Sequence, residues 1–222
     1  MTVQQIKIDI ISDVVCPWCY LGQRRLQLAL EKTSDIVKAE ISWKPYQLEP
    51  NAPPEGFDSM DYLGRKLGGV DGVKRAHDML TNLAGEVGLP IAFEKASRFP
   101  NTLDAHRLIH WAGLVGAETQ DKVARALFTA NFVDGLDVGS VATLIEIAAD
   151  CGMDRTAVEQ KLATDADRDH VLTEISQAQR MGVSGVPCFV IDKQYAVTGA
   201  QSVEVFVNAF RQIAEMKMQA AE

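Results

Sequence analysis

Two cysteines near the N-terminus, Cys16 and Cys19, are separated by Pro17 and Trp18. An apolar segment precedes them and a segment with helical periodicity follows, so we expect them where a strand ends and a helix begins. At a helix N-terminus, unpaired N–H groups stabilise a thiolate, and such a cysteine titrates below the ordinary thiol pKa of about 8.5. The sequence therefore predicts a nucleophilic Cys16 with an exposed sulfur, and Pro17 in the first helical turn.

Cys19 follows Cys16 by three residues, which places both sulfurs on the same side of the predicted helix. It can then form a disulfide with Cys16 or resolve a mixed disulfide held there. Trp18 is predicted to lie exposed over the site and to contact an apolar substrate. An alternative is an inert structural pair or half of a zinc site, but zinc takes four ligands and the sequence contains no second cysteine pair. The candidate partners His106 and His110 lie far outside the spacing of common zinc modules, so we predict no metal.

A second chemical signal is Gly185-Val186-Pro187, directly before an apolar segment with strand character. Proline at a strand start is tolerated where the preceding bond has a special geometry or where an edge is open. A cis Val186–Pro187 bond would turn the Val186 backbone toward Cys16, where its N–H and C=O can pair with an extended substrate. Alone, this tripeptide is typical of an ordinary turn. Together with the cysteine motif it predicts a substrate-binding edge at Val186 and Pro187.

The segments that must position these residues have strand character at both ends of the chain. Alternation of apolar and polar residues or short apolar runs mark four segments, residues 5–12, 37–46, 187–191 and 195–198. Helical periodicity runs from the cysteine motif to about residue 32 and again over residues 202–218. We therefore predict one sheet built from both ends of the chain.

The middle of the chain, residues 58–181, has helical periodicity almost throughout. Breaks rich in glycine and proline divide it into about seven short helices. These helices cannot join the sheet, yet their apolar stripes need burial. The predicted fold class is therefore α/β, with an all-helical insertion that forms a lid over the two cysteines.

The composition is that of an ordinary globular domain. Of the 222 residues, 47% are hydrophobic and 23% are charged, which allows a sizeable core and argues against disorder. The net charge of −8 and the scattered Lys and Arg exclude a basic face for nucleic acid. Apolar runs fall short of the roughly 18 residues that span a bilayer, and the start lacks a signal-peptide pattern. We predict a cytoplasmic protein with no membrane or nucleic-acid partner, and the sequence does not fix its oligomeric state.

Asp13, the remaining cysteines and the histidines are further ionisable residues with possible roles. Asp13 either takes a proton from Cys19 as a buried carboxylate or is a solvated acid at the strand end. Cys188 is predicted to be a small buried hydrophobic residue, with a third redox thiol as the alternative. Cys151 is predicted to be inert. His106 and His110 lie one helical turn apart and are assigned surface or cleft-lining roles.

Several longer motifs extend these signals. They are Ser12-Asp13-Val14-Val15-Cys16-Pro17-Trp18-Cys19-Tyr20-Leu21-Gly22, Pro100-Asn101-Thr102-Leu103-Asp104-Ala105-His106-Arg107-Leu108, Gly182-Val183-Ser184-Gly185-Val186-Pro187 and Tyr195-Ala196-Val197-Thr198-Gly199-Ala200-Gln201. Together they resemble the DsbA family of thioredoxin-fold proteins, in its cytoplasmic FrnE-type branch, over nearly the whole chain. One departure is Cys188, where the resemblance leads us to expect an aromatic residue.

The resemblance implies a thioredoxin fold interrupted by a helical domain. Residues 1–56 and 182–222 would form the thioredoxin-like domain, and residues 57–181 the inserted helical domain. It also implies a redox dithiol at Cys16 and Cys19 and a cis-proline at Pro187. The segment 101–107 would face the dithiol, with Asn101 and His106 among the substrate-binding residues. The implied activity is that of a thiol-disulfide oxidoreductase or isomerase acting on a disulfide- or dithiol-containing protein, peptide or small molecule.

The alternative function is a glutathione-dependent transferase or isomerase of the related kappa-class type. That branch has a serine in place of the first cysteine, so the presence of Cys16 favours dithiol exchange. Glutathione stays open as a reductant or substrate, because backbone N–H groups of residues 199–201 near a helix start can hold its carboxylate. No other cofactor is expected. A third class, a chaperone with an apolar cleft around Trp18, predicts activity that survives loss of both cysteines, and the redox direction is not fixed by the sequence.

Overall fold

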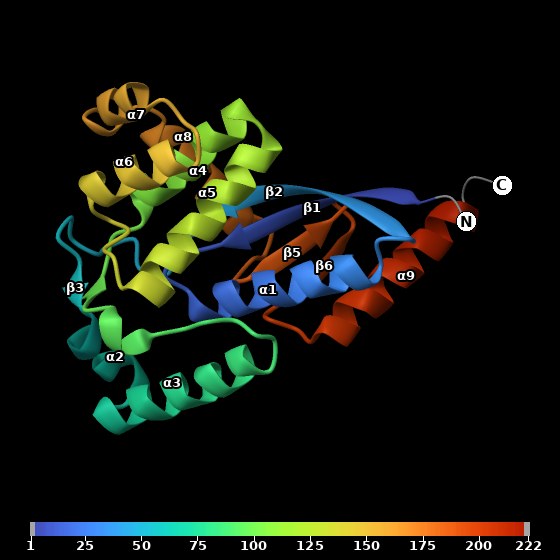
Figure 1. Cartoon of the computed structure of the whole chain (residues 1–222), viewed down its shortest axis with the longest axis horizontal. Coiled ribbons are helices and arrows are strands. Elements are labelled where there is room, and N and C mark those ends of the chain that lie inside the picture. The colour runs from blue at the N-terminus through green and yellow to red at the C-terminus, as the bar shows by residue number, and fades with distance from the viewer. Residues whose placement is uncertain (1–2, 220–222) are drawn as a thin grey trace.

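A four-stranded sheet forms the centre of the molecule in the computed structural model, which describes residues 3–219 (Figure 1). Its strand order is β2-β1-β5-β6, with bounds β1 Gln4–Ser12, β2 Val37–Pro45, β5 Cys188–Ile191 and β6 Tyr195–Thr198. Strand β1 pairs parallel with β2 and antiparallel with β5, and β6 pairs antiparallel with β5. The prediction of one sheet from both ends of the chain is confirmed.

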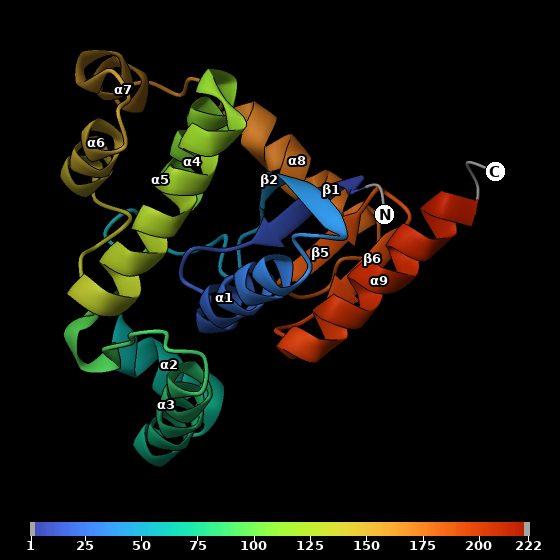
Figure 2. The ribbon, with the colours of Figure 1, turned by 45° about the vertical axis from the view of Figure 1, so that its right-hand side comes forward.

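Helices cover both faces of this sheet. Successive residues of β5 point to opposite faces, as the pleat of a strand requires. Phe189 packs edge-on against Phe206 of α9 (Val203–Gln219), with ring centroids 4.9 Å apart. Cys188 instead packs with Ile11 and with Ala178 of α8 (Arg168–Arg180). Figure 2 shows α8 on one side of the sheet, and α9 with α1 (Pro17–Lys32) on the other.

The segment between β2 and β5 is mostly helical. Its seven α-helices within the described residues are α2 Ser59–Leu67, α3 Val70–Gly85, α4 Leu103–Val115, α5 Ala117–Thr129, α6 Val141–Asp150, α7 Arg155–Leu162 and α8. The all-helical prediction is wrong in one detail, because β3 (Phe57–Asp58) and β4 (Arg98–Phe99) pair antiparallel. Strands of two residues carry no alternation that a sequence pattern can reveal.

The inserted helices pack directly against the edge of the sheet. Gln120 of α5 accepts a hydrogen bond from the Trp43 N–H at 3.0 Å and donates one to the Trp43 carbonyl oxygen at 3.3 Å. A side-chain amide thus satisfies backbone groups of β2 that an open edge would leave exposed. Tyr20 of α1 stacks with Phe128 of α5 at 5.7 Å between ring centroids, within one apolar core. The core is continuous between sheet and insertion, and the domain boundaries at 56/57 and 181/182 stay a prediction.

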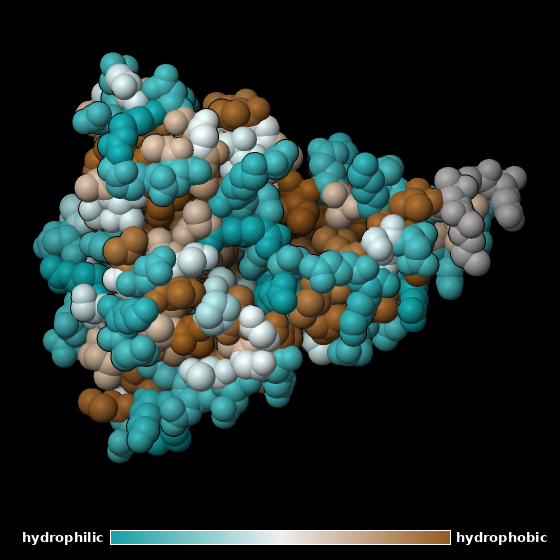
Figure 3. Space-filling view, viewed as in Figure 1, coloured by the Kyte–Doolittle hydropathy of each residue, from teal (hydrophilic) through white to brown (hydrophobic). Residues whose placement is uncertain are grey.

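The surface carries its apolar residues in small groups. On the face drawn in Figure 3, hydrophobic residues are interspersed with hydrophilic ones over both the sheet and the inserted helices. Among the described helices, none is long and apolar enough to cross a membrane.

Candidate active site

Cys16 lies at the junction that the sequence predicts. It is the N-cap residue of α1, with extended backbone angles (φ −88°, ψ 110°), and Pro17 occupies the first turn. The Cys16 N–H donates to the carbonyl oxygen of Asp13 at 3.0 Å, and the Cys16 carbonyl oxygen accepts from the N–H of Cys19 at 3.0 Å. This tight turn delivers the chain from β1 into α1 and sets both cysteines at the helix N-terminus, where the helix dipole favours negative charge.

The Val186–Pro187 peptide bond is cis, as predicted. The Cys16 sulfur donates to the Val186 carbonyl oxygen at a distance of 3.7 Å, so the proline segment and the first cysteine are neighbours. Cys16 is only 3% exposed. The prediction of an exposed sulfur is wrong, because the sulfur packs against the Val186 segment and within the main apolar core.

Gly22 lets α1 approach the cis-proline closely. A Cβ added at this position would lie 2.9 Å from Pro187 Cγ and 3.1 Å from Phe189 Cζ. We expect Gly22→Ala to destabilise the protein by about 1–2 kcal/mol, because overpacking outweighs the gain in helix propensity. Urea unfolding measures the difference. The matched control is Gly64→Ala in α2, where nothing lies within 4 Å of the added Cβ. Equal stability of the two variants would contradict the close packing of α1 on the proline.

Cys19 lies behind Cys16 and is 1% exposed. Burial raises the pKa of the Cys19 thiol well above its ordinary value, and the hydrogen bond to Cys16 and the charge of Cys16 raise it further. A hydrogen bond from the Asp13 backbone acts in the opposite direction and is outweighed. At neutral pH Cys19 is therefore a protonated thiol, which is the state expected of a resolving cysteine before it attacks the mixed disulfide.

The order of alkylation tests this difference between the two thiols. In the reduced protein at neutral pH, we expect iodoacetamide to modify Cys16 well before Cys19, because the raised pKa of Cys19 keeps it a protonated thiol. In Cys16→Ser, the pKa of Cys19 should fall, since two of the causes that raise it are removed, but burial should keep it above the ordinary thiol value. Peptide mapping after timed quenching provides the measurement. Faster labelling of Cys19 would reverse the roles of the two cysteines.

Asp13 is a buried carboxylate, 1% exposed, so the alternative of a solvated acid is wrong, while proton transfer from Cys19 stays a prediction. Its Oδ2 atom accepts a hydrogen bond from the Leu48 N–H at 2.8 Å, and its Oδ1 atom lies 3.5 Å from Nε2 of His106. Neither Oδ1 nor that Nε2 has a hydrogen-bond partner among the described residues. A buried acid and a buried imidazole thus face each other next to the dithiol turn. The sequence shows both residues but gives no signal for their contact.

Other residues of the 101–107 segment lie in different directions. His106 reaches Asp13, whereas Arg107 donates hydrogen bonds to the carbonyl oxygens of Lys161, Thr164 and Ala166. Arg107 therefore fixes the connection between α7 and α8, and the segment as a whole does not face the dithiol. The two residues are consecutive in α4, so their side chains leave the helix in directions about 100° apart.

Asn101 holds a loop near the site. Its Oδ1 atom accepts from Gln47 Nε2 at 3.2 Å and from the Leu103 N–H at 3.0 Å, and its Nδ2 atom donates to the Ala52 carbonyl oxygen at 2.7 Å. These contacts secure the chain that follows β2, the same chain that donates to Asp13. Substrate binding by Asn101 stays a prediction.

Trp18 lies differently from its predicted position. It is half-buried and packs against the main apolar core, instead of standing fully exposed over the site.

A cavity of about 960 Å³ opens on the α8 side of the sheet. Val186, Pro187 and Cys188 are among the residues that line it, together with the 181–185 segment and parts of β5, β6 and α8. The cis-proline segment therefore touches the Cys16 sulfur as well as a cavity large enough for a substrate.

Cys188 and Cys151 were predicted to be unreactive. Cys188 is 3% exposed and belongs to a small apolar cluster, and burial raises its pKa. Burial also raises the pKa of the half-buried Cys151, at the end of α6. The buried hydrophobic placement predicted for Cys188 is confirmed, while its chemical inertness stays a prediction.

A cysteine pair at the N-terminus of the first helix, opposite a cis-proline that enters an antiparallel strand, defines a thioredoxin-fold protein with a dithiol site. The chain belongs to the DSBA-like thioredoxin domain family, whose family model matches residues 7–211. This places it among the DsbA-like thiol-disulfide oxidoreductases. The FrnE-type branch within that family stays a prediction.

Comparison with individual proteins agrees with this placement. A crystal structure of a probable DsbA oxidoreductase from Streptomyces coelicolor is 31% identical, with a TM-score of 0.82 over 93% of this chain and 89% of that one. The uncharacterized protein YwbO of Bacillus subtilis is 26% identical over 210 residues, which cover 92% of this chain and 95% of YwbO. The cytosolic disulfide reductase DsbM from Pseudomonas aeruginosa, solved with GSH, shares the fold at 14% identity, with a TM-score of 0.61 over 96% and 99% of the two chains.

Proposed function

We propose that the protein is a cytoplasmic thiol-disulfide oxidoreductase or isomerase whose reactive dithiol is Cys16-Pro17-Trp18-Cys19. The observation that carries the proposal is the arrangement of the two sulfurs. Cys16 caps α1 and touches the Val186 carbonyl oxygen, while burial and Cys16 keep Cys19 protonated behind it. One thiol is thus placed to attack and the other to resolve.

The reaction has two exchange steps. The Cys16 thiolate attacks one sulfur of a substrate disulfide, a Cys16–substrate bond forms, and the other substrate sulfur leaves as a thiolate. Cys19 then loses its proton and attacks the Cys16 sulfur, which releases the second substrate thiolate. The Cys16–Cys19 pair is oxidised by two electrons and the substrate is reduced to a dithiol. Run in reverse, the same steps oxidise a substrate dithiol.

Asp13 is the proposed acceptor of the Cys19 proton. Its backbone hydrogen-bonds the Cys19 sulfur and its carboxylate is buried beside the same turn. His106 lies 3.5 Å from the free carboxylate oxygen and is the group placed to share the proton once Asp13 has taken it. A buried base of this kind takes the thiol proton as Cys19 attacks the mixed disulfide, which increases the rate of resolution.

The substrate is proposed to bind across the cis-proline segment. Backbone groups of Val186 pair with an extended substrate, and the adjoining cavity takes its side chains or a small disulfide. Glutathione is the first candidate reductant. Within residues 199–201 the N–H of Ala200 is the candidate donor to its carboxylate, because the N–H groups of Gly199 and Gln201 already donate to the carbonyl oxygens of Pro187 and Gly199. The guanidinium of Arg25, which donates to the Ala200 carbonyl oxygen at 2.7 Å, supports this assignment by placing a cation there.

Equilibration with glutathione tests the proposal. Protein is incubated in buffers of varied glutathione to glutathione-disulfide ratio, quenched with acid and alkylated, and its Cys16–Cys19 peptide is measured by mass spectrometry. We expect a reversible transition between dithiol and internal disulfide with the slope of a two-electron couple. A pair that never forms the internal disulfide, while Cys16 carries a stable glutathione adduct, would support the kappa-class alternative instead.

A further inference from the structure

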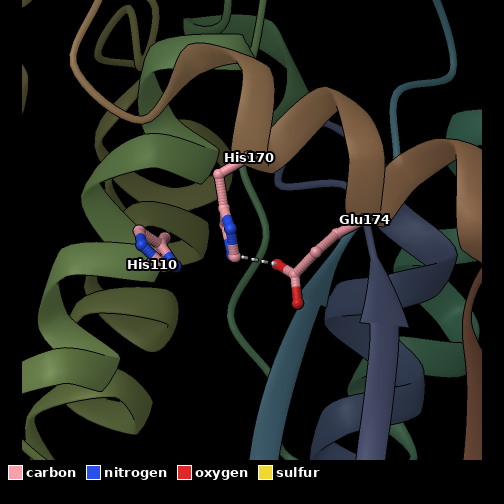
Figure 4. A group of neighbouring side chains, drawn as sticks. All are labelled: His110, His170 and Glu174. Carbon is pink, nitrogen blue, oxygen red and sulfur yellow. Dashed lines mark ion pairs between the residues drawn. The ribbon is translucent and has the colours of Figure 1, made fainter.

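Two histidines and a glutamate face one another where α4 meets α8. His110 comes from α4, and His170 and Glu174 are one turn apart on the same side of α8 (Figure 4). The imidazole rings of His110 and His170 have centroids 4.2 Å apart, and Oε2 of Glu174 lies 3.8 Å from Nε2 of His170. One potential ligand atom from each of the three side chains lies within 4.8 Å of the other two.

We propose that His110, His170 and Glu174 bind a divalent transition-metal ion, with zinc as the best match. Two imidazoles and one carboxylate suit zinc, copper or nickel, whereas calcium and magnesium prefer oxygen ligands. Zinc takes nitrogen and oxygen ligands at about 2.0–2.2 Å, so two ligands of one tetrahedral ion lie roughly 3.4 Å apart. The candidate ligand atoms lie within 4.8 Å of one another, so small rotations of the side chains bring them to the ligand spacing of one ion, and water is the fourth ligand.

The surroundings of the two histidines favour a bound cation. The half-buried side chain of His110 lies against the ring of His170. Asp167, held by a 2.8 Å hydrogen bond from Trp111 Nε1, adds negative charge near both imidazoles.

Lys44 of β2 fixes the carboxylate. Its Nζ atom donates to Oε1 of Glu174 at 2.9 Å, while Oε2 is the oxygen directed toward His170. One carboxylate oxygen is thus engaged by the protein and the other is left for the ion, which is the usual role of an outer-shell partner. The charge of Lys44 repels a bound cation, whereas the carboxylate of Asp167 near the two imidazoles attracts it.

A metal in this position would tie α8 to α4. Glu174 and Lys44 both line the large cavity, and α8 leads into the segment that ends at the cis-proline. The ion would therefore hold one wall of the proposed substrate cavity, independently of the chemistry of the cysteines. In the sequence, His106 is the candidate metal-binding partner of His110, and no metal is predicted. In the structure His106 faces Asp13, and the neighbours of His110 come from α8, which is distant in sequence.

Zinc titration of the tag-free full-length protein tests the site. The parent carries Cys16→Ser and Cys19→Ser, so that the dithiol cannot bind zinc. Calorimetry should show one bound zinc ion per chain, and saturating zinc should raise the unfolding midpoint because only the folded chain holds the three ligands together. Substituting cobalt should give the visible absorption of a coordinated ion.

Single variants in this parent identify the ligands. Because even outer-shell substitutions weaken metal binding about 10- to 100-fold, His110→Ala, His170→Ala and Glu174→Gln should each lower zinc affinity at least about tenfold. His77→Ala, which removes a histidine of α3 stacked on Phe93, should leave affinity unchanged. Lys44→Met breaks the contact to Glu174 but removes no ligand, so it should still bind one zinc ion and lose less affinity than His170→Ala does.

His170→Ala decides the outcome should another variant fail to fold, since the His170 side chain is 51% exposed. Loss of both zinc affinity and the zinc-dependent rise in unfolding midpoint in this variant would support the site. Absence of zinc binding in the parent, or equal affinity in the parent and His170→Ala, would overturn the proposal.

Discussion

The Cys16→Ser variant is expected to lose disulfide-reductase turnover by about 10³-fold or more, because a serine hydroxyl at neutral pH is neither ionised nor able to form a mixed disulfide. Reduction of insulin or of a fluorescent disulfide peptide by glutathione measures the loss. Fold and stability should change little, since serine keeps the size and the backbone contacts of this N-cap position.

Cys151→Ser is the matched control for this loss. It removes a half-buried cysteine at the end of α6 and should retain full turnover. Full turnover in both Cys16→Ser and Cys151→Ser would exclude a nucleophilic Cys16. Equal loss in both variants would show that the assay responds to cysteine content and not to the dithiol.

The second large effect is expected from Asp13→Asn. The amide keeps the shape of the side chain and can still accept the hydrogen bond from the Leu48 N–H at 2.8 Å, but it cannot take a proton. General acid–base catalysis typically contributes about 10²–10⁴-fold, so we expect the resolving step to slow by about a hundredfold. The attack by Cys16 should be much less affected. Single-turnover kinetics, in which the mixed disulfide accumulates in the variant, separates the two steps.

The dependence on pH distinguishes a lost base from a disturbed fold. Because burial raises the pKa of Cys19, its thiolate fraction at neutral pH is small and increases about tenfold per pH unit below that pKa. Without Asp13, resolution should therefore accelerate steeply as pH rises and recover part of the lost rate. A merely structural loss would not recover in this way.

Asp154→Asn provides the control for the charge change. Asp154 also accepts a hydrogen bond from a backbone N–H, that of Ala157 at 3.0 Å, and it caps α7. The substitution removes the same charge and retains the same type of contact, so resolution should be unchanged. A normal resolution rate in Asp13→Asn would show that the buried carboxylate has no part in proton transfer.

Local signals account for the parts of the fold that the sequence predicts well. The helix from Pro17 to Lys32 follows from an N-cap cysteine, a proline in the first turn and regular apolar spacing. The strands at both chain ends follow from alternation and from the limits that proline sets. The sequence predicts the cis bond before Pro187 because Gly185 and Pro187 precede a strand in a chain that also contains a Cys-x-x-Cys motif.

Contacts between distant segments could not be predicted in this way. The burial of Cys16 depends on how Val186 docks against α1, and the pairing of Asp13 with His106 depends on how α4 packs against the dithiol turn. No periodicity encodes either contact, because each needs the relative position of two elements. The contact of Gln120 with the edge of β2 is of the same kind.

Dithiol exchange requires a mixed disulfide on Cys16 that Cys19 then converts into the internal disulfide, and neither the kappa-class nor the chaperone alternative includes this second step. In Cys19→Ser the attack remains possible, but resolution does not. After incubation with glutathione disulfide, intact-mass spectrometry should show one glutathionyl group per chain, removable by dithiothreitol and mapped to Cys16, whereas the wild type should proceed to the internal disulfide. An unmodified Cys19→Ser variant, or a glutathionyl group on Cys151 or Cys188 in place of Cys16, would contradict the assignment of Cys16 as the attacking thiol.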